Sequence, residues 1–291
     1  MYQLIKKYKY YSLHLMVIVL GFTGVFGKLI TLDELHLVWY RMLIACVSLI
    51  IFLIYKNELF KIDRKQFFEL LGVGSIVTLH WIFFFKSIKV SSISVSVICL
   101  STSSLFSAFI EPIFFKRRII KYEVIMGLIV IIALSYMMGT DSKNLLGYIY
   151  GILAAFLGTL FTLFNAKYLK KIDASKITMV EMLAGVIIIS FIFLYQGDNT
   201  VINTIPTISN SLYLIILGTI CTAMVFVWMT EIMRHISPYS LIMAINLEPI
   251  YSILLALIIF GNTEFMSNSF YIGSSIIIAI VFLEAYLKNK Q

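Results

Sequence analysis

The chain has 291 residues, of which 60% are apolar and only 13% are charged. Soluble domains average about 45–50% apolar and about 25% charged residues, so this much apolar surface requires a lipid environment. That excludes a cytosolic enzyme, a disordered chain and a disulfide-rich secreted scaffold. The formal net charge of +8 does not indicate nucleic-acid binding, because the charges lie in short segments between apolar runs, as in membrane proteins.

Three lysines precede the first apolar run, which reaches from Tyr11 to about Ile30. This arrangement resembles a signal peptide, but the run is longer than a typical signal peptide's apolar core and no small-residue cleavage site follows it. We interpret it as an uncleaved first membrane span.

Ten apolar runs are long enough to cross the membrane, because a helix of about 20 residues spans about 30 Å of hydrocarbon. We predict spans at about 11–30, 36–55, 67–86, 91–114, 120–138, 147–168, 176–196, 212–233, 238–260 and 268–287. The links between them are short, so no extramembrane domain is expected. The apolar pattern is hardly interrupted near 87–90 and 234–237. Two neighbouring runs could therefore be one span, and a count of nine spans is the alternative.

The charges between the spans predict the orientation of the chain. With the N-terminus inside, the inner segments hold 18 of the 23 Lys and Arg residues and the outer segments hold 3. Because inner loops of membrane proteins carry the excess of Lys and Arg, both termini are expected to be cytoplasmic. The predicted location is the cytoplasmic (inner) membrane, with multiple passes.

The two halves of the chain match at an offset of 146 residues, as in Leu71-Gly72 and Leu217-Gly218. Such matches in the same span order indicate an internal repeat, with a first unit at 11–140 and a second at 147–287. Each unit has five spans, and because five is odd the two copies must insert in opposite orientations. The predicted fold class is an all-α integral membrane protein of ten transmembrane helices, arranged as two inverted five-helix repeats.

Inverted repeats give a pseudo-two-fold axis in the membrane plane. One set of helices can then form inward-open and outward-open states of similar energy, which is the basis of alternating access. The alternative is a channel or scaffold that the repeats merely stabilise. Polar groups inside the spans favour a transporter, since they would be costly without a use.

Several motifs recur in the two halves. Leu71-Gly72 begins an aromatic-rich run through Phe85, Leu217-Gly218 begins its counterpart, and the second half also contains Leu247-Glu248-Pro249. With Gly261 twelve residues after Pro249 and Arg41 early in the second span, these features resemble the EamA-type branch of the drug/metabolite transporter superfamily over nearly the whole chain. The resemblance implies a carrier of small molecules such as amino acids, nucleobases, amphiphilic metabolites or drugs. The first half departs from the pattern, with Thr102-Ser103 where the second has Glu248-Pro249.

Glu248 is the leading candidate for chemistry. It lies about eleven residues into its span, near mid-depth, where an ionised carboxylate is expensive. Such a group can exchange a proton with either side of the membrane, as a proton-coupled carrier requires. Alternatively, the carboxyl is protonated and braces the helix break at Pro249.

Further polar and aromatic residues are candidates for the same cavity. Serines of the fourth span share one face of the helix at about 100° per residue, although serine is also common at helix contacts in membranes. Aromatic walls suit flat or cationic ligands. The predicted substrate cavity is lined by His80, Trp81, Ser96, Ser103, Trp228, Asn246, Glu248 and Tyr251.

Arg41 and Glu181 occupy matching places in the two halves. Each lies about five residues from the end of its span, on opposite membrane faces, so we predict that they serve as gating residues at the outer and inner mouths. Arg41 either orients an anionic substrate group or pairs with the neighbouring Asp33 or Glu34. For Glu181, the expected partners are Lys167 and Lys176 of the inner surface.

No motif in the sequence indicates catalysis or nucleotide hydrolysis, so the chain is predicted not to be an enzyme. The cysteines Cys46, Cys99 and Cys221 each lie alone in apolar runs, and we expect no metal site and no cofactor. The predicted function is secondary-active transport of a small metabolite by alternating access, by a monomer or homodimer. Expected partners are the small-molecule substrate, the lipid bilayer and protons as a candidate coupling ion, with no nucleic acid. The alternatives are a passive facilitator or channel and, less favoured, an intramembrane transferase.

Overall fold

The computed structural model describes residues 9–58, 62–140, 142–196 and 206–288, and this part of the chain is helical throughout, without β-strands. The first half contains α2 (Lys9–Leu29), α3 (Glu34–Tyr55), α4 (Arg64–Val90), α5 (Ile93–Leu100), α6 (Ser103–Phe115) and α7 (Lys121–Thr140). The second half contains α8 (Leu145–Tyr168), α9 (Ala174–Tyr195), α11 (Ile208–Gly218), α12 (Val225–Ile232), α13 (Pro238–Ile245), α14 (Glu248–Phe260) and α15 (Asn268–Lys288). Short 3₁₀ turns lie at Ser142–Asn144 and Gly261–Glu264, and a π-helical turn at Thr219–Met224 joins α11 to α12.

The helices follow the apolar runs because a bilayer offers no hydrogen bonds to the backbone. Polar residues mark helix ends in the links: the Asp33 carboxylate accepts the N–H groups of Leu35 and His36 at the start of α3. Within the described residues, eight spans are long and apolar enough to cross a membrane, and Glu248–Phe260 and Asn268–Ile280 are shorter apolar helices. The chain is therefore a multi-pass membrane protein, and the count of ten spans stays a prediction.

Two of the predicted spans are not continuous helices: the one at 238–260, where a break at Pro249 was expected, and the one at 91–114, where none was. The span at 238–260 is divided between α13 and α14 at Asn246 and Leu247. Pro249 has no N–H group to bond the carbonyl four residues earlier, so a new helix starts with proline in its first turn. In the span at 91–114, α5 ends before Thr102, whose hydroxyl donates to the Cys99 carbonyl (2.7 Å). Hydroxyls that bond nearby carbonyls favour such an interruption.

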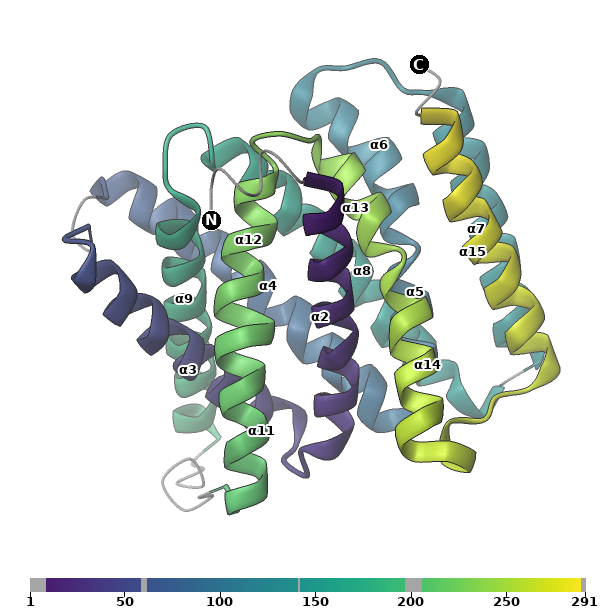
Figure 1. The fold of residues 1–291 in the computed structure, drawn as a ribbon, viewed down its shortest axis with the longest axis horizontal. Helices are drawn as coiled ribbons and strands as arrows, with labels where there is room; N and C mark the ends of the chain where they lie inside the picture. Colours follow the sequence, from purple (N-terminus) through teal and green to yellow (C-terminus); the bar gives the residue numbers. More distant parts are fainter. Residues whose placement is uncertain (1–8, 59–61, 141, 197–205, 289–291) are drawn as a thin grey trace.

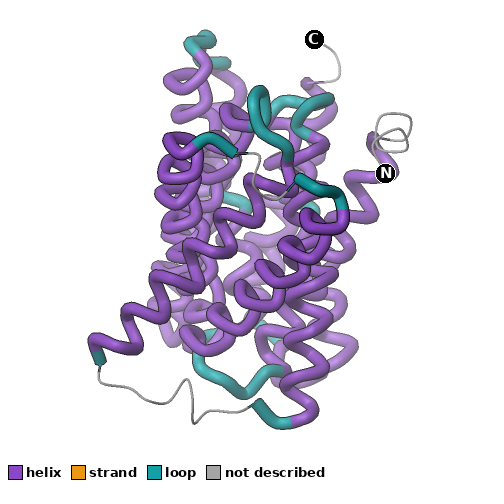
Figure 2. The backbone as a smooth tube through the Cα atoms, turned by 90° about the vertical axis from the view of Figure 1, so that its left-hand side faces the viewer, coloured by secondary structure: helices purple, strands orange, loops and turns teal. Residues whose placement is uncertain are grey.

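The helices form one bundle, with α2 near its middle in Figure 1. The N-terminal end of α2 and the C-terminal end of α15 lie at the same end of the bundle, and most helices run lengthwise between its two ends (Figures 1 and 2). The most extensive contacts join α4 to α8 and α9, α3 to α9, and α2 to α14. The helices α7 and α15 form a pair at one side of the bundle (Figure 1).

Burial follows the pattern expected in lipid. Large apolar side chains such as Ile132, Leu194 and Ile258 are exposed on the outside, while ionisable side chains including Arg41 and Glu181 are buried inside. The exposed apolar surface is what a bilayer would solvate. The buried polar groups therefore direct attention to the centre of the bundle.

Helix α2 packs closely against α14 at the centre of the bundle. A β-carbon added at Gly21 would lie 3.0 Å from the β-carbon of Tyr251, so a larger residue would push the helices apart. The Ser252 hydroxyl donates to the Gly21 carbonyl at 3.0 Å. This contact holds α14, which starts at Glu248, against the middle of the bundle.

Candidate functional site

A cavity of about 80 Å³ lies among α2, α3, α4, the α5–α6 pair, α8, α12 and the α13–α14 pair. A buried water needs about 10–15 Å³ on this measure, so the cavity has room for several waters or part of a small ligand. Its lining is mainly apolar and aromatic. The lining residues are Leu20, Thr23, Arg41, His80, Trp81, Phe84, Leu100, Ser103, Gly158, Thr159, Phe161, Thr162, Phe226, Met229, Ile242, Ile245 and Glu248.

Both helix breaks reach this cavity. Ser103 is the first residue of α6 and Glu248 is the first residue of α14, and both line the cavity. The cap residues Thr102 and Leu247 make no side-chain hydrogen bond to either helix start. Most backbone N–H groups near the breaks bond carbonyls of the preceding turn, as those of Ser104 and Ile250 do with the Ser101 and Leu247 carbonyls. The start of a helix carries a partial positive charge, and both breaks place such a start beside the cavity.

Arg41 lies in the cavity wall rather than at the outer mouth, which corrects its predicted place. Its side chain is 1% exposed and its guanidinium lies 4.0 Å from the centre of the Trp81 ring. The Nε atom donates to the Thr222 hydroxyl at 2.6 Å and Nη2 contacts the Cys221 carbonyl at 3.4 Å. Both partners belong to the π-helical turn, a feature found often at functional sites. The remaining nitrogen, Nη1, has no hydrogen-bond partner among the described residues.

The acidic residues proposed as partners of Arg41 are used elsewhere. Asp33 caps α3 and lies 2.5 Å from the ring of His36, while Glu34 pairs with Lys86 at 3.0 Å. Inside the bundle, the guanidinium of Arg41 is stabilised by the Trp81 ring and by its hydrogen bond to the Thr222 hydroxyl. Arg41 therefore has no need of a carboxylate from the outer surface.

Glu248 faces the same cavity with a side chain that is 5% exposed. It is close enough to Arg41 for the two charges to interact, yet among the described residues no direct ion pair or hydrogen bond to Glu248 is formed. The cavity lining thus includes a guanidinium with one buried nitrogen that makes no hydrogen bond, and a carboxyl with no direct partner among the described residues.

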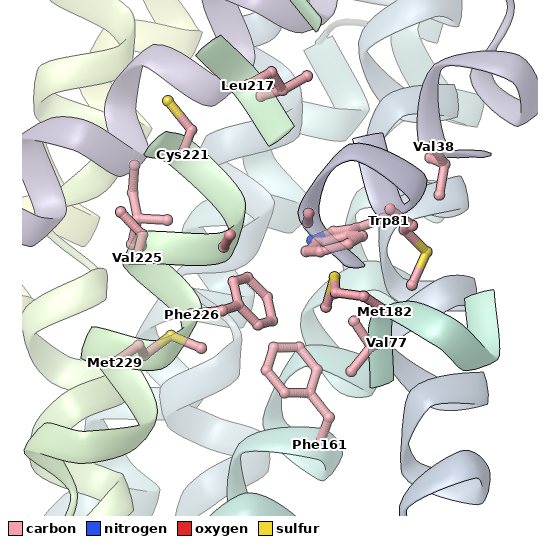
Figure 3. Close-up of a cluster of buried hydrophobic side chains, with 14 of the residues drawn as sticks. Val38, Val77, Trp81, Phe161, Met182, Leu217, Cys221, Val225, Phe226 and Met229 are labelled. Carbon is pink, nitrogen blue, oxygen red and sulfur yellow. The ribbon is translucent and has the colours of Figure 1, made fainter. Parts of the chain in front are cut away.

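An aromatic wall connects α4, α8 and α12. The rings of Trp81 and Phe226 lie 4.9 Å apart, and those of Phe161 and Phe226 lie 5.7 Å apart, nearly parallel. Figure 3 shows these three side chains turned toward one another from three helices. His80 completes the wall, since its Nδ1–H donates to the Ala154 carbonyl at 2.7 Å and its ring meets Phe161 at 5.3 Å.

Four of the eight predicted cavity residues line the cavity, namely His80, Trp81, Ser103 and Glu248. The other four do not line the cavity. Three of them make contacts elsewhere in the bundle, and the fourth lies in a helix break. The Ser96 hydroxyl lies 2.7 Å from that of Ser87, Trp228 donates to the Ser12 hydroxyl at 2.6 Å, Tyr251 packs on Gly21, and Asn246 is buried at the break before α14.

Glu181 is also misplaced by the sequence analysis. It is fully buried within α9 instead of facing the inner mouth, and a β-carbon added at Gly74 of α4 would lie 2.8 Å from its α-carbon. Lys176, one of the expected partners, pairs instead with Glu58 at 2.7 Å and with Asp173 at 3.7 Å. Among the described residues, Glu181 does not line the cavity, and Lys176 pairs with other carboxylates.

Several lining residues were missed from the sequence. Phe161 and Phe226 look like ordinary apolar residues of their spans, so composition gives no signal for them. Thr159 and Thr162 could have been noticed, because residues three apart lie on one face of a helix and hydroxyls are otherwise sparse in that span. Both threonine hydroxyls also bond carbonyls four residues earlier.

The comparisons with known proteins agree with this architecture. The sequence model of the EamA-like transporter family matches residues 9–139 and again residues 145–285. A relative from Archaeoglobus fulgidus, named an uncharacterized transporter, is 25% identical over 231 residues, which cover 77% of this chain and 79% of the relative. A solved crystal structure covers 94% of this chain and 96% of its own with a TM-score of 0.70 at 13% identity, which shows a shared fold alone. Because the family model matches twice and covers most of the sequence, the chain belongs to the EamA-like transporter family and is a membrane transporter of the drug/metabolite transporter superfamily.

Proposed function

We propose that the protein carries a small metabolite across the cytoplasmic membrane by secondary-active transport with alternating access. The observation that carries this proposal is the central cavity, in which Arg41 and Glu248 face one space beside an aromatic wall. Intramembrane charges are costly, so they persist where a substrate or ion uses them. Discontinuous helices at such a site are a common feature of secondary transporters.

The course of the helices supports the alternating-access part of the proposal. In Figure 1, α2 begins at the end of the bundle where α15 finishes, whereas α8, the first helix of the second half, begins at the opposite end. Five spans in each half, running in opposite directions, would form two inverted repeats. The excess of Lys and Arg in the links at the α2 end would place both termini in the cytoplasm.

The cavity chemistry favours an amphoteric substrate among the candidate metabolites. The free Nη1 donor of Arg41 suits a carboxylate, and the Glu248 carboxyl suits an amino group. The rings of Trp81 and Phe226 provide an apolar or flat surface between α4 and α12. An amino acid with an apolar or aromatic side chain combines these features better than an uncharged nucleobase or a purely cationic drug.

The alternatives make different demands on the cavity. A passive facilitator would share the fold, and only the kinetics of flux separate it from a carrier. An intramembrane transferase usually needs paired carboxylates or histidines at one depth, whereas this cavity is lined by one carboxyl and one histidine. Carrier function is therefore preferred.

The test is an uptake screen with the purified protein in lipid vesicles. Labelled amino acids, nucleobases and amphiphilic metabolites are offered with and without a pH gradient. We expect saturable uptake of a zwitterionic compound that the gradient increases. Uptake proportional to concentration without saturation would favour a channel, and chemical conversion of a compound would favour a transferase.

A further inference from the structure

A second polar cluster lies where α9 packs against α3 and α4, beside Asn165 of α8 and outside the cavity. Glu181 is 0% exposed, and neither of its carboxyl oxygens has a hydrogen-bond partner among the described residues. The amide of Asn165 on α8, also 0% exposed, is near enough to interact with this carboxyl. Its geometry, however, makes no regular hydrogen bond. The hydroxyl of Thr178, one helical turn before Glu181, is likewise buried without a partner.

The packing around this cluster is tight and contains no cation for Glu181. A β-carbon added at Gly74 would lie 2.5 Å from that of Ala184 and 2.8 Å from the Glu181 carbonyl oxygen. Several titratable groups of the helices that pack on α9 have other partners in the described part of the chain. They are Arg41 with Thr222, His36 with Asp33, Cys46 with the Met179 carbonyl, Glu69 with Tyr168, His80 with the Ala154 carbonyl, Lys86 with Glu34, Lys89 with the Ile30 carbonyl, Lys176 with Glu58, and Glu231 with Arg234.

The chemical form of Glu181 follows from this environment. An ionised carboxylate buried without a cation or donors is far less stable than the neutral acid, because nothing replaces its hydration. The side chain must therefore hold a proton in this arrangement of helices. Glu181 lies seven residues after Ala174, where α9 begins at the inner end, which is a depth of about 10 Å at about 1.5 Å per residue.

We propose that Glu181 is a proton-binding site of its own, separate from Glu248, which releases its proton toward the cytoplasm when α9 moves relative to α4 and α8. The proposal rests on the proposed transport function, since alternating access supplies the movement. Water reaching the carboxyl would stabilise the ionised form, and helix closure would require the proton again. The substrate cavity is not needed for this binding, because Glu181, Asn165 and Thr178 do not line it.

The first test measures proton binding without transport. Thermal unfolding of the purified protein in lipid nanodiscs is followed from about pH 5 to about pH 9. A site that is protonated when folded makes the native state bind more protons than the unfolded state, so stability falls as pH rises. We expect the unfolding midpoint of the wild type to fall by about 2–4 °C or more over this range, and that of Glu181→Gln to change much less.

Matched variants separate this effect from general damage. Glu123 is a buried carboxyl paired with Arg117 at 3.0 Å, so Glu123→Gln should lower the midpoint yet keep the wild-type slope with pH. Glu248→Gln should also keep the part of the slope that Glu181 contributes. Glu181→Met, of similar length and without a titrating group, gives the same flattened profile and keeps the test open if the glutamine variant does not fold.

Two results would overturn the proposal. The first is a pH profile of Glu181→Gln and Glu181→Met identical to that of the wild type. The second is stabilisation of the wild type by sodium at fixed pH that is lost in Glu181→Gln, which would make the cluster a sodium site. Because no substrate is present, failure here leaves the transport proposal intact, and failure of the uptake screen leaves this measurement valid.

Discussion

At the scale of single residues, the cavity is unusual because it holds an arginine, Arg41, and a carboxyl, Glu248, inside the membrane-spanning bundle. The guanidinium of Arg41 is held by the Trp81 ring and by hydrogen bonds to the π-helical turn, and these contacts replace part of its lost hydration. Glu248 has no comparable contacts among the described residues. Its carboxyl is stabilised only by the nearby charge of Arg41 and by the partial positive charge at the start of α14. The arginine is therefore a fixed group, and the carboxyl is the one free to exchange a proton or bind a substrate.

The first prediction concerns Glu248→Gln. Glutamine copies the size and hydrogen bonding of the protonated acid, so the fold and the exchange of substrate across the membrane should remain. Net uptake should lose its dependence on a pH gradient, because no proton can be released. The measurement is uptake into vesicles with and without the gradient, with Glu231→Gln, at the Arg234 ion pair, as the control. Gradient-driven accumulation by Glu248→Gln would show that another group carries the coupling proton.

Sequence reasoning succeeded at this scale only where the residue type restricts the outcome. A carboxylate at mid-depth must face a polar space, so Glu248 could be placed in the cavity from its position alone. Arg41 and Glu181 were assigned to the mouths because depth was judged from sequence distance to the span ends. Which face of the helix each occupies depends on neighbouring helices, and the contacts with Trp81 and with Asn165 leave no pattern in the sequence.

Broken helices are the elements that bring backbone groups to the cavity. The break before α14 is caused by Pro249, whereas the break before α6 occurs without proline, next to the hydroxyls of Thr102 and Ser104. The proline signal was visible in the sequence. The hydroxyl signal was not, because serine and threonine also occur inside continuous membrane helices.

The second prediction concerns Pro249→Ala. Alanine restores an N–H group and allows α13 and α14 to join, which would rotate Glu248 away from the cavity. We expect substrate affinity to fall about tenfold or more, equivalent to about 1.4 kcal/mol, with little loss of stability. Binding is measured by the quenching of tryptophan fluorescence as substrate is added. Pro112→Ala in α6, whose proline does not line the cavity, should bind substrate like the wild type, and equal affinities in both variants would contradict the role of the break.

For the whole molecule, the lipid environment made the helix layout predictable. Apart from the breaks in the spans at 91–114 and 238–260, the predicted spans are largely helical where the structure describes them, because a run of about 20 apolar residues in a bilayer has to satisfy its own backbone. Relative placement could not be predicted in the same way. The cavity depends on how α4, α8 and α12 pack around the rings of Trp81, Phe161 and Phe226, and apolar sequences leave that arrangement open.

The third prediction tests the orientation. Single cysteines at Lys143 and Ser209 should react with a membrane-impermeant reagent from outside the cell, and cysteines at Lys65 and Lys171 only after the membrane is opened. All four positions are exposed, whereas the native cysteines are buried and serve as the unlabelled background. Labelling at Lys143 from the cytoplasmic side alone would reverse the proposed topology.

The central claim is that one cavity is exposed alternately to the two sides of the membrane. Counterflow tests it directly: vesicles containing the protein are loaded with unlabelled substrate and diluted into a trace of labelled substrate, with no pH gradient. In a carrier, each unlabelled molecule that leaves brings the binding site to the outer face, where it can bind a labelled molecule and carry it in. Labelled substrate inside the vesicles should therefore rise for a time above its equilibrium level. Labelled substrate that rises only to equilibrium, at a rate independent of the internal load, would contradict alternating access and identify a channel.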